Sequence, residues 1–104
     1  MAFQWQININ STGQSSPRAA FDPGTLNASA RDQIFWTNND TEPHWPGPKD
    51  SEGNVDQDGW FPNQIAGRSE FSTDTSAQWS PSLPGSYPYA CSLHPNEEGT
   101  IIVT

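Results

Sequence analysis

The chain has 104 residues and a mean hydropathy of −0.77, which predicts one domain, residues 1–104, with a thin core and no second domain. Its formal net charge of −8 argues against nucleic acid or an anionic membrane as a partner, since both would repel it, and favours a basic protein. No run approaches the ~20 apolar residues that a membrane span needs, and the first ten residues do not resemble a signal peptide.

Ten prolines and eight glycines predict many short strands and turns rather than long helices. Residues 3–10 (F-Q-W-Q-I-N-I-N) alternate apolar and polar side chains, which is typical of a strand with one buried face. Residues 19–27 predict a short strand followed by a turn. The next strand is expected at 33–36, running on into Thr37, and the asparagines that follow it favour a turn.

The middle of the chain is predicted to be irregular. Residues 41–48 contain three prolines, which predict an extended segment or a loop. Residues 49–59 are polar and acidic, which indicates an exposed loop. Further elements are expected as one helical turn at 62–66 and strands at 69–73, 76–80, 87–91 and 99–104. Phe71 and Trp79 are the expected inward anchors of two of these strands. Seven or eight short strands without an amphipathic helix indicate an all-β sandwich of the Greek-key kind.

The chain contains only two histidines and one cysteine, and two of the three lie in the segment Cys91-Ser92-Leu93-His94. A single cysteine forms no internal disulfide, so its thiol is a metal ligand, a reactive group or an apolar filler. His44 follows a predicted strand and its polar turn. Loops of a sandwich gather at one end, which allows the three side chains to meet. Two imidazoles and one thiolate are the trigonal ligand set of a type 1 copper centre.

Four segments resemble the plastocyanin and amicyanin group of cupredoxins, and together they cover most of the chain. They are F-D-P-G-T-L at 21–26, D-Q-I-F-W-T-N-N-D at 32–40 leading to H-W-P at 44–46, G-S-Y-P-Y-A-C-S-L-H-P at 85–95, and G-T-I-I-V at 99–103. A C-x-x-H pair alone would be weak evidence. Its combination with the upstream N-x-D-x-x-x-H-x-P segment makes the resemblance specific.

The resemblance implies one copper ion, cycling between Cu(I) and Cu(II), with His44, Cys91 and His94 as equatorial ligands. It implies a single-electron carrier that exchanges electrons with a redox protein, through the exposed edge of His94. It also implies a periplasmic or extracellular protein whose signal is not part of this sequence. We expect a monomer. Asn39 is the candidate outer residue that stiffens the two ligand loops.

One position departs from the family. The family places a methionine three residues after the second histidine, and here that position is Glu97, while the only methionine is Met1. Three arrangements stay open for the axial position. Glu97 binds through its carboxylate, or it points to solvent and leaves an open or water-filled site, or the backbone carbonyl of Pro43 approaches the metal. Glu98 is a weaker candidate.

An axial carboxylate would change the copper chemistry. At about 3 Å and an effective dielectric near 20, it favours Cu(II) over Cu(I) by roughly 5–6 kcal/mol. That energy corresponds to a potential about 0.2 V lower than with a neutral ligand. Oxygen coordination also draws Cu(II) toward a tetragonal geometry. We therefore predict a low-potential centre that is not intensely blue.

The same residues allow other interpretations. Zinc accepts two histidines, a cysteine and a carboxylate. Cys91 could be a small buried hydrophobic residue, or a nucleophile paired with a histidine. A small copper redox enzyme or sensor, with a labile axial site that admits nitric oxide or peroxide, is the alternative to an electron carrier, and copper storage fits least. Whether the chain is an enzyme stays open, with the carrier favoured.

Overall fold

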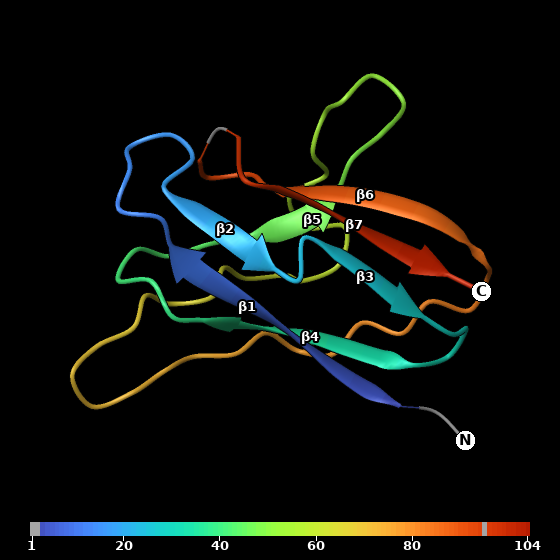
Figure 1. Ribbon diagram of the computed structural model, residues 1–104, viewed down its shortest axis with the longest axis horizontal. Helices are drawn as coiled ribbons and strands as arrows, with labels where there is room; N and C mark the ends of the chain where they lie inside the picture. Colours follow the sequence, from blue (N-terminus) through green and yellow to red (C-terminus); the bar gives the residue numbers. More distant parts are fainter. Residues whose placement is uncertain (1–2, 95) are drawn as a thin grey trace.

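The computed structural model describes residues 3–94 and 96–104 (Figure 1). These residues form seven strands and no helix, which confirms the predicted all-β class. The strands are β1 (Gln4–Ser11), β2 (Ala19–Asp22), β3 (Thr25–Ala28), β4 (Gln33–Asn38), β5 (Pro46–Pro48), β6 (Gly85–Cys91) and β7 (Glu98–Val103). Within the described part of the chain, no helix is long and apolar enough to cross a membrane.

The strands form two sheets that face each other as a sandwich. One sheet has the order β2-β1-β4 and the other β3-β7-β6-β5, and Figure 1 shows the chain passing from the first to the second between β2 and β3. Strands distant in the chain lie side by side, since β1 runs parallel to β4 and β3 parallel to β7. The hairpin of β6 and β7 is antiparallel, and the loop that joins these two strands carries the second predicted ligand segment.

The core lies between the sheets and is rich in aromatic rings. The alternation predicted for the first strand is confirmed, because Ile7 and Ile9 are fully buried, although Phe3 at its start is exposed. Trp36 from β4 meets Tyr89 from β6 edge to face, with ring centroids 5.3 Å apart. Side chains two residues apart on a strand share a face. Core packing of Tyr89 therefore fixes the inward direction of Cys91 at the end of the same strand.

Three expectations for the segment between β5 and β6 are wrong. Residues 62–66 form no helical turn, because Ile65 instead makes an isolated bridge with His44. Residues 69–73 form no strand, and Phe71 is 90% exposed rather than an inward anchor. At 76–80 only Trp79 forms a bridge, to Ile34, and its ring packs against the core as expected. Local patterns miss these long-range pairings.

The stretch 41–48, predicted to be extended or looped, ends in a short strand. Its last three residues form β5, which pairs antiparallel with β6 and places Pro46 opposite Cys91. Proline lacks an N–H group and is tolerated in a sheet at its edge, and β5 is the edge strand of its sheet. This pairing brings the segment that contains His44 beside the end of β6. The loop at 49–59 is mostly exposed, as expected.

Replacement of a buried and of an exposed aromatic residue by alanine should change the free energy of unfolding by very different amounts. Trp36→Ala removes a fully buried ring and should lower the free energy of unfolding by about 3–5 kcal/mol. Phe71→Ala removes an exposed ring and should change it by less than about 0.5 kcal/mol. Urea denaturation of the metal-free proteins measures both values. Similar losses in the two variants would contradict the packing described here.

Candidate metal centre

Two segments of the chain supply the predicted ligands, and backbone hydrogen bonds fix both. His44 lies between β4 and β5, where its N–H donates to the Ile65 carbonyl (3.1 Å) and the Ile65 N–H donates back (2.7 Å). Cys91 ends β6, and its N–H donates to the carbonyl of Glu97 (3.0 Å), which closes the loop that carries His94. His44 and Cys91 therefore stand on paired backbone, and His94 lies in the short loop that the Cys91–Glu97 hydrogen bond closes.

The structure brings these three residues and Glu97 together. One donor atom from each of the four lies within 4.8 Å of all the others. The sulfur of Cys91 is 3.7 Å from His44 Nδ1 and 3.8 Å from His94 Nδ1. Both imidazoles thus direct Nδ1 toward the thiol. Among the described residues, this is the group that offers the donors a metal ion needs.

The four candidate ligands differ in their exposure to solvent. His44, Cys91 and Glu97 are buried, while the side chain of His94 is 23% exposed. Leu93, the neighbour of His94, is exposed. An exposed imidazole edge bordered by an apolar side chain is the single route from the cluster to solvent that these ligands provide.

Glu97 does not point to solvent, so the open-site arrangement that relied on that orientation is wrong. Its Oε1 lies 2.8 Å from His44 Nδ1 and 3.4 Å from His94 Nδ1. Its Oε2 accepts a hydrogen bond from the Ala19 N–H (2.9 Å). Burial alone would raise the pKa of Glu97, but the hydrogen bond and charge of His44 lower it below its ordinary value. The carboxylate is therefore ionised and held among the candidate ligands.

The sulfur of Cys91 receives two backbone N–H groups. The amide of Trp45, next to His44, and the amide of Leu93 each lie 3.4 Å from Sγ. Both amides come from the segments that carry the candidate ligands, so the backbone that assembles the cluster also fixes the position of the sulfur.

The outer residues differ from the expectation for Asn39. The side-chain amide of Asn39 donates to Asn8 and Asn10 on β1. Its neighbour Asn38 is buried, donates to the carbonyls of Glu42 (2.8 Å) and Ala66 (3.1 Å), and so joins the His44 segment to the segment that contains Ile65. The strand period could have indicated that Asn38 points inward, because it follows the buried Trp36 by two positions.

A residue that sequence reasoning missed contacts the far side of the His44 ring. The carboxylate of Asp40 lies 2.8 Å from His44 Nε2 and is buried. Burial alone would raise the pKa of Asp40, but hydrogen bonds from His44, Thr41 and Arg18 lower it. Pro43 directly precedes His44 and is half-buried, and its carbonyl as a ligand stays a prediction.

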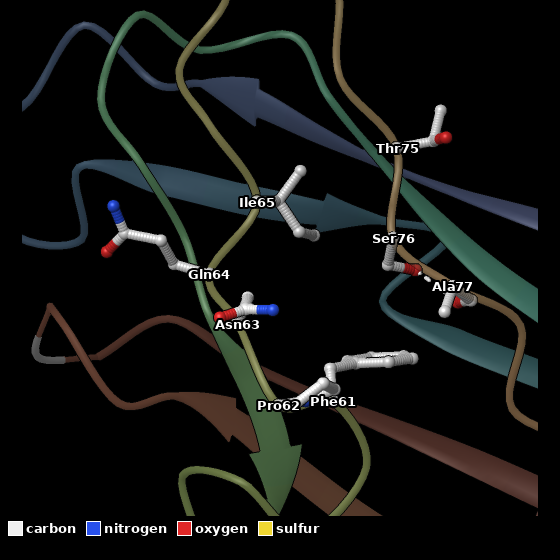
Figure 2. A pocket seen from close by; sticks show the side chains of 8 residues that line it. All are labelled: Phe61, Pro62, Asn63, Gln64, Ile65, Thr75, Ser76 and Ala77. Atoms are coloured by element: carbon white, nitrogen blue, oxygen red, sulfur yellow. Dashed lines mark hydrogen bonds between the residues drawn. The ribbon is translucent and has the colours of Figure 1, made fainter.

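A surface pocket of about 170 Å³ lies beside the ligand segments without including them. Figure 2 shows its lining side chains, which come from 61–65 and 75–77: Phe61, Pro62, Asn63, Gln64, Ile65, Thr75, Ser76 and Ala77. None of the four candidate ligands belongs to this lining. The pocket therefore borders the backbone of Ile65, which pairs with His44, and its lining contains no candidate ligand.

Comparison with known proteins identifies the fold. No protein-family model and no curated protein matches the chain. Among solved structures, it is similar to a purple cupredoxin from Nitrosopumilus maritimus with a TM-score of 0.76, at 24% identity over 95% of this chain and 98% of that one. An amicyanin from Paracoccus versutus matches with a TM-score of 0.64, at 19% identity over 99% of this chain and 81% of that one. A mutant fern plastocyanin matches with a TM-score of 0.69, at 18% identity over 95% and 99% of the two chains.

The chain has the cupredoxin fold. The predicted resemblance is thus confirmed at the level of architecture. In this cupredoxin sandwich the candidate ligands lie where β4, β5, β6 and β7 meet, and their donor atoms are two imidazole nitrogens, one sulfur and one carboxylate oxygen. Such a mixture suits copper or zinc and does not suit magnesium or calcium, which prefer oxygen ligands.

The buried charges predict how the stability of the metal-free protein responds to pH. Burial alone would lower the pKa of His44, but hydrogen bonds to Cys91, Glu97 and Asp40 raise it from 6.5 to about 10. Its contribution to stability is complete below pH 6.5 and is lost as the pH rises toward 10. The lowered pKa values of Asp40 and Glu97 give contributions that are complete above their ordinary values of 3.8 and 4.5 and are lost in acid.

Metal-free protein should therefore be most stable between about pH 5 and 6.5 and should weaken in both directions. Urea denaturation across pH 3 to 10 measures this profile. In His44→Gln the decline above pH 6.5 should flatten, because the titrating imidazole is gone. Stability that rises steadily from pH 6.5 to 9 in the metal-free protein would contradict a protonated, doubly paired His44.

Proposed function

We propose that this chain is a copper-binding single-electron carrier. One copper ion is held by His44 and His94 through Nδ1 and by Cys91 as thiolate, with Glu97 as an axial ligand. The observation that carries the proposal is the convergence of these four donor atoms within 4.8 Å at one end of a cupredoxin sandwich. An amicyanin of the same fold is described in a reduced Cu(I) form, which supports copper as the metal here.

The copper ion would supply reversible exchange between Cu(II) and Cu(I). The chain's part is to hold the donors still, because a ligand set that does not move on reduction transfers electrons with little reorganisation. His44 pairs with Ile65, and Cys91 lies in β6 opposite Pro46. Both ligands therefore stand on hydrogen-bonded backbone, which supports a carrier role.

Electrons enter and leave through the exposed edge of His94, in this proposal. That imidazole is the ligand with solvent contact, and Leu93 beside it offers an apolar surface for docking. The partner is a redox protein, and the net charge of −8 favours a basic one. A periplasmic or extracellular location and a monomeric state complete the proposal.

Carrier function is favoured over a small copper enzyme or sensor. The alternative requires an axial position that a small molecule can occupy. Glu97 is buried, places Oε1 among the ligand atoms and has Oε2 tied to the Ala19 amide. Its carboxylate therefore occupies the volume that an exchangeable molecule would need, which supports a closed centre.

The axial carboxylate predicts a low potential and an unusual colour. Glu97→Met replaces a charged oxygen ligand with a neutral thioether, so the potential should rise by about 0.2 V. The Cu(II) spectrum should change from green, red or weakly coloured to intense blue. Spectroelectrochemistry of the two copper-loaded proteins measures both.

The matched control is Glu98→Gln, which removes the neighbouring carboxylate. Glu98 is exposed and pairs with Lys49 at the surface, so its loss should leave the spectrum unchanged. An intense blue band in both the wild type and Glu97→Met would show that Glu97 is not a strong ligand. No thiolate-to-copper band in either protein would remove copper and bring zinc forward.

Cys91 gives a second test of the centre. In Cys91→Ser the donor is a poor copper(II) ligand, so the visible charge-transfer band should vanish. Copper affinity, measured by competition with a chelator, should fall at least tenfold. Ser92→Ala is the control, because its hydroxyl contacts Trp45 and Gln57 rather than the cluster. Retention of the band in Cys91→Ser would contradict the thiolate assignment.

A further inference from the structure

The His44 ring has a carboxylate on each of its two nitrogens. Nδ1 faces Glu97 Oε1 and Nε2 faces Asp40 Oδ2, both at 2.8 Å. The Cys91 sulfur lies on the Nδ1 side. If Nδ1 takes the metal, Nε2 carries the proton and donates it to Asp40. A histidine whose second nitrogen donates to a carboxylate is a stronger and better oriented ligand.

Asp40 is itself held firmly. Arg18 donates from Nε to Oδ2 (3.0 Å) and from Nη2 to Oδ1 (3.5 Å). The Thr41 N–H donates to Oδ1 (2.8 Å), and the Asp40 N–H donates to the side-chain oxygen of Asn38 (2.9 Å). The carboxylate is 2% exposed, so little solvent competes for it. Its position is determined before any metal binds.

Two successive residues connect both carboxylates to the start of β2. The Arg18 side chain binds Asp40, and the Ala19 amide at the start of β2 binds Glu97. The two bonds hold the carboxylates on opposite sides of the same ring. The start of β2 thus fixes His44 from both nitrogens without supplying a ligand.

We propose that Asp40, held by Arg18, is a positioning residue that orients His44 Nδ1 toward the metal and tunes the reduction potential through Nε2. The negative charge of Asp40 favours the more highly charged Cu(II), and the positive charge of Arg18 partly offsets it. The tuning part rests on the proposed copper function. The orienting part applies to any metal that the cluster binds.

The two residues should shift the potential in opposite directions. In Asp40→Asn the ratio of Cu(II) to Cu(I) binding constants should fall about tenfold, which is a rise of about 59 mV. In Arg18→Met the charge of Asp40 is left unbalanced, so the potential should fall. Glu42→Gln is the matched control, because Glu42 is exposed and 4.0 Å from Arg18, and it should change little. Loss of packing alone would not produce opposite signs.

A second measurement needs no copper. In the zinc-loaded protein, nuclear magnetic resonance follows exchange of the His44 Nε2 proton with solvent. Exchange should be at least tenfold faster in Asp40→Asn than in wild type and Glu42→Gln. If Asp40→Asn fails to fold, Arg18→Met, which removes a partly exposed side chain, carries the potential test.

The outcomes separate this inference from the proposed function. Absence of a copper–thiolate band in wild type would overturn the electron-carrier proposal, while slower proton exchange in wild type than in Asp40→Asn would still support the orienting role. Shifts of the same sign in Asp40→Asn and Arg18→Met, or proton exchange in Asp40→Asn equal to that of Glu42→Gln, would overturn the role of Asp40.

Discussion

Burial of the His44 ring between two carboxylates is the constraint on which the rest of the site depends. Ionised groups withdrawn from water are tolerated only when paired and hydrogen-bonded. Each carboxylate therefore needs a donor outside the cluster. Arg18 donates a hydrogen bond to Asp40, and the Ala19 amide donates one to Glu97. The start of β2 therefore belongs to the site although it holds no candidate ligand.

The aromatic core and the candidate centre share two strands, β4 and β6. Trp36 and Tyr89 pack against each other between the sheets, and two residues further along their strands stand Asn38 and Cys91. Both residues point inward. Asn38 joins two backbone segments, and Cys91 contributes its sulfur to the candidate centre. The aromatic part of the core therefore lies next to the strand ends that carry these two residues.

Sequence reasoning predicted the four residues that the structure brings together. His44 and the Cys91–His94 pair contain the only histidines and the only cysteine of the chain, and Glu97 stands at the position where the family has a methionine. Asp40 was missed because its turn-favouring neighbours explained it without any partner, and Arg18 lies 22 positions away. The predicted helical turn at 62–66 is absent for the same physical reason. Ile65 pairs with His44, which is distant in the sequence, and this pairing outweighs the local helical preference.

The prolines of β5 have a consequence for how copies of this molecule behave toward each other. An unpaired strand at the margin of a sheet offers N–H and C=O groups on which another chain can add, and this is a common start of aggregation. In β5, Pro46 and Pro48 have no N–H to offer, and the strand is only three residues long. The segment that aligns the metal-binding loop therefore also limits fibril-like growth from this edge.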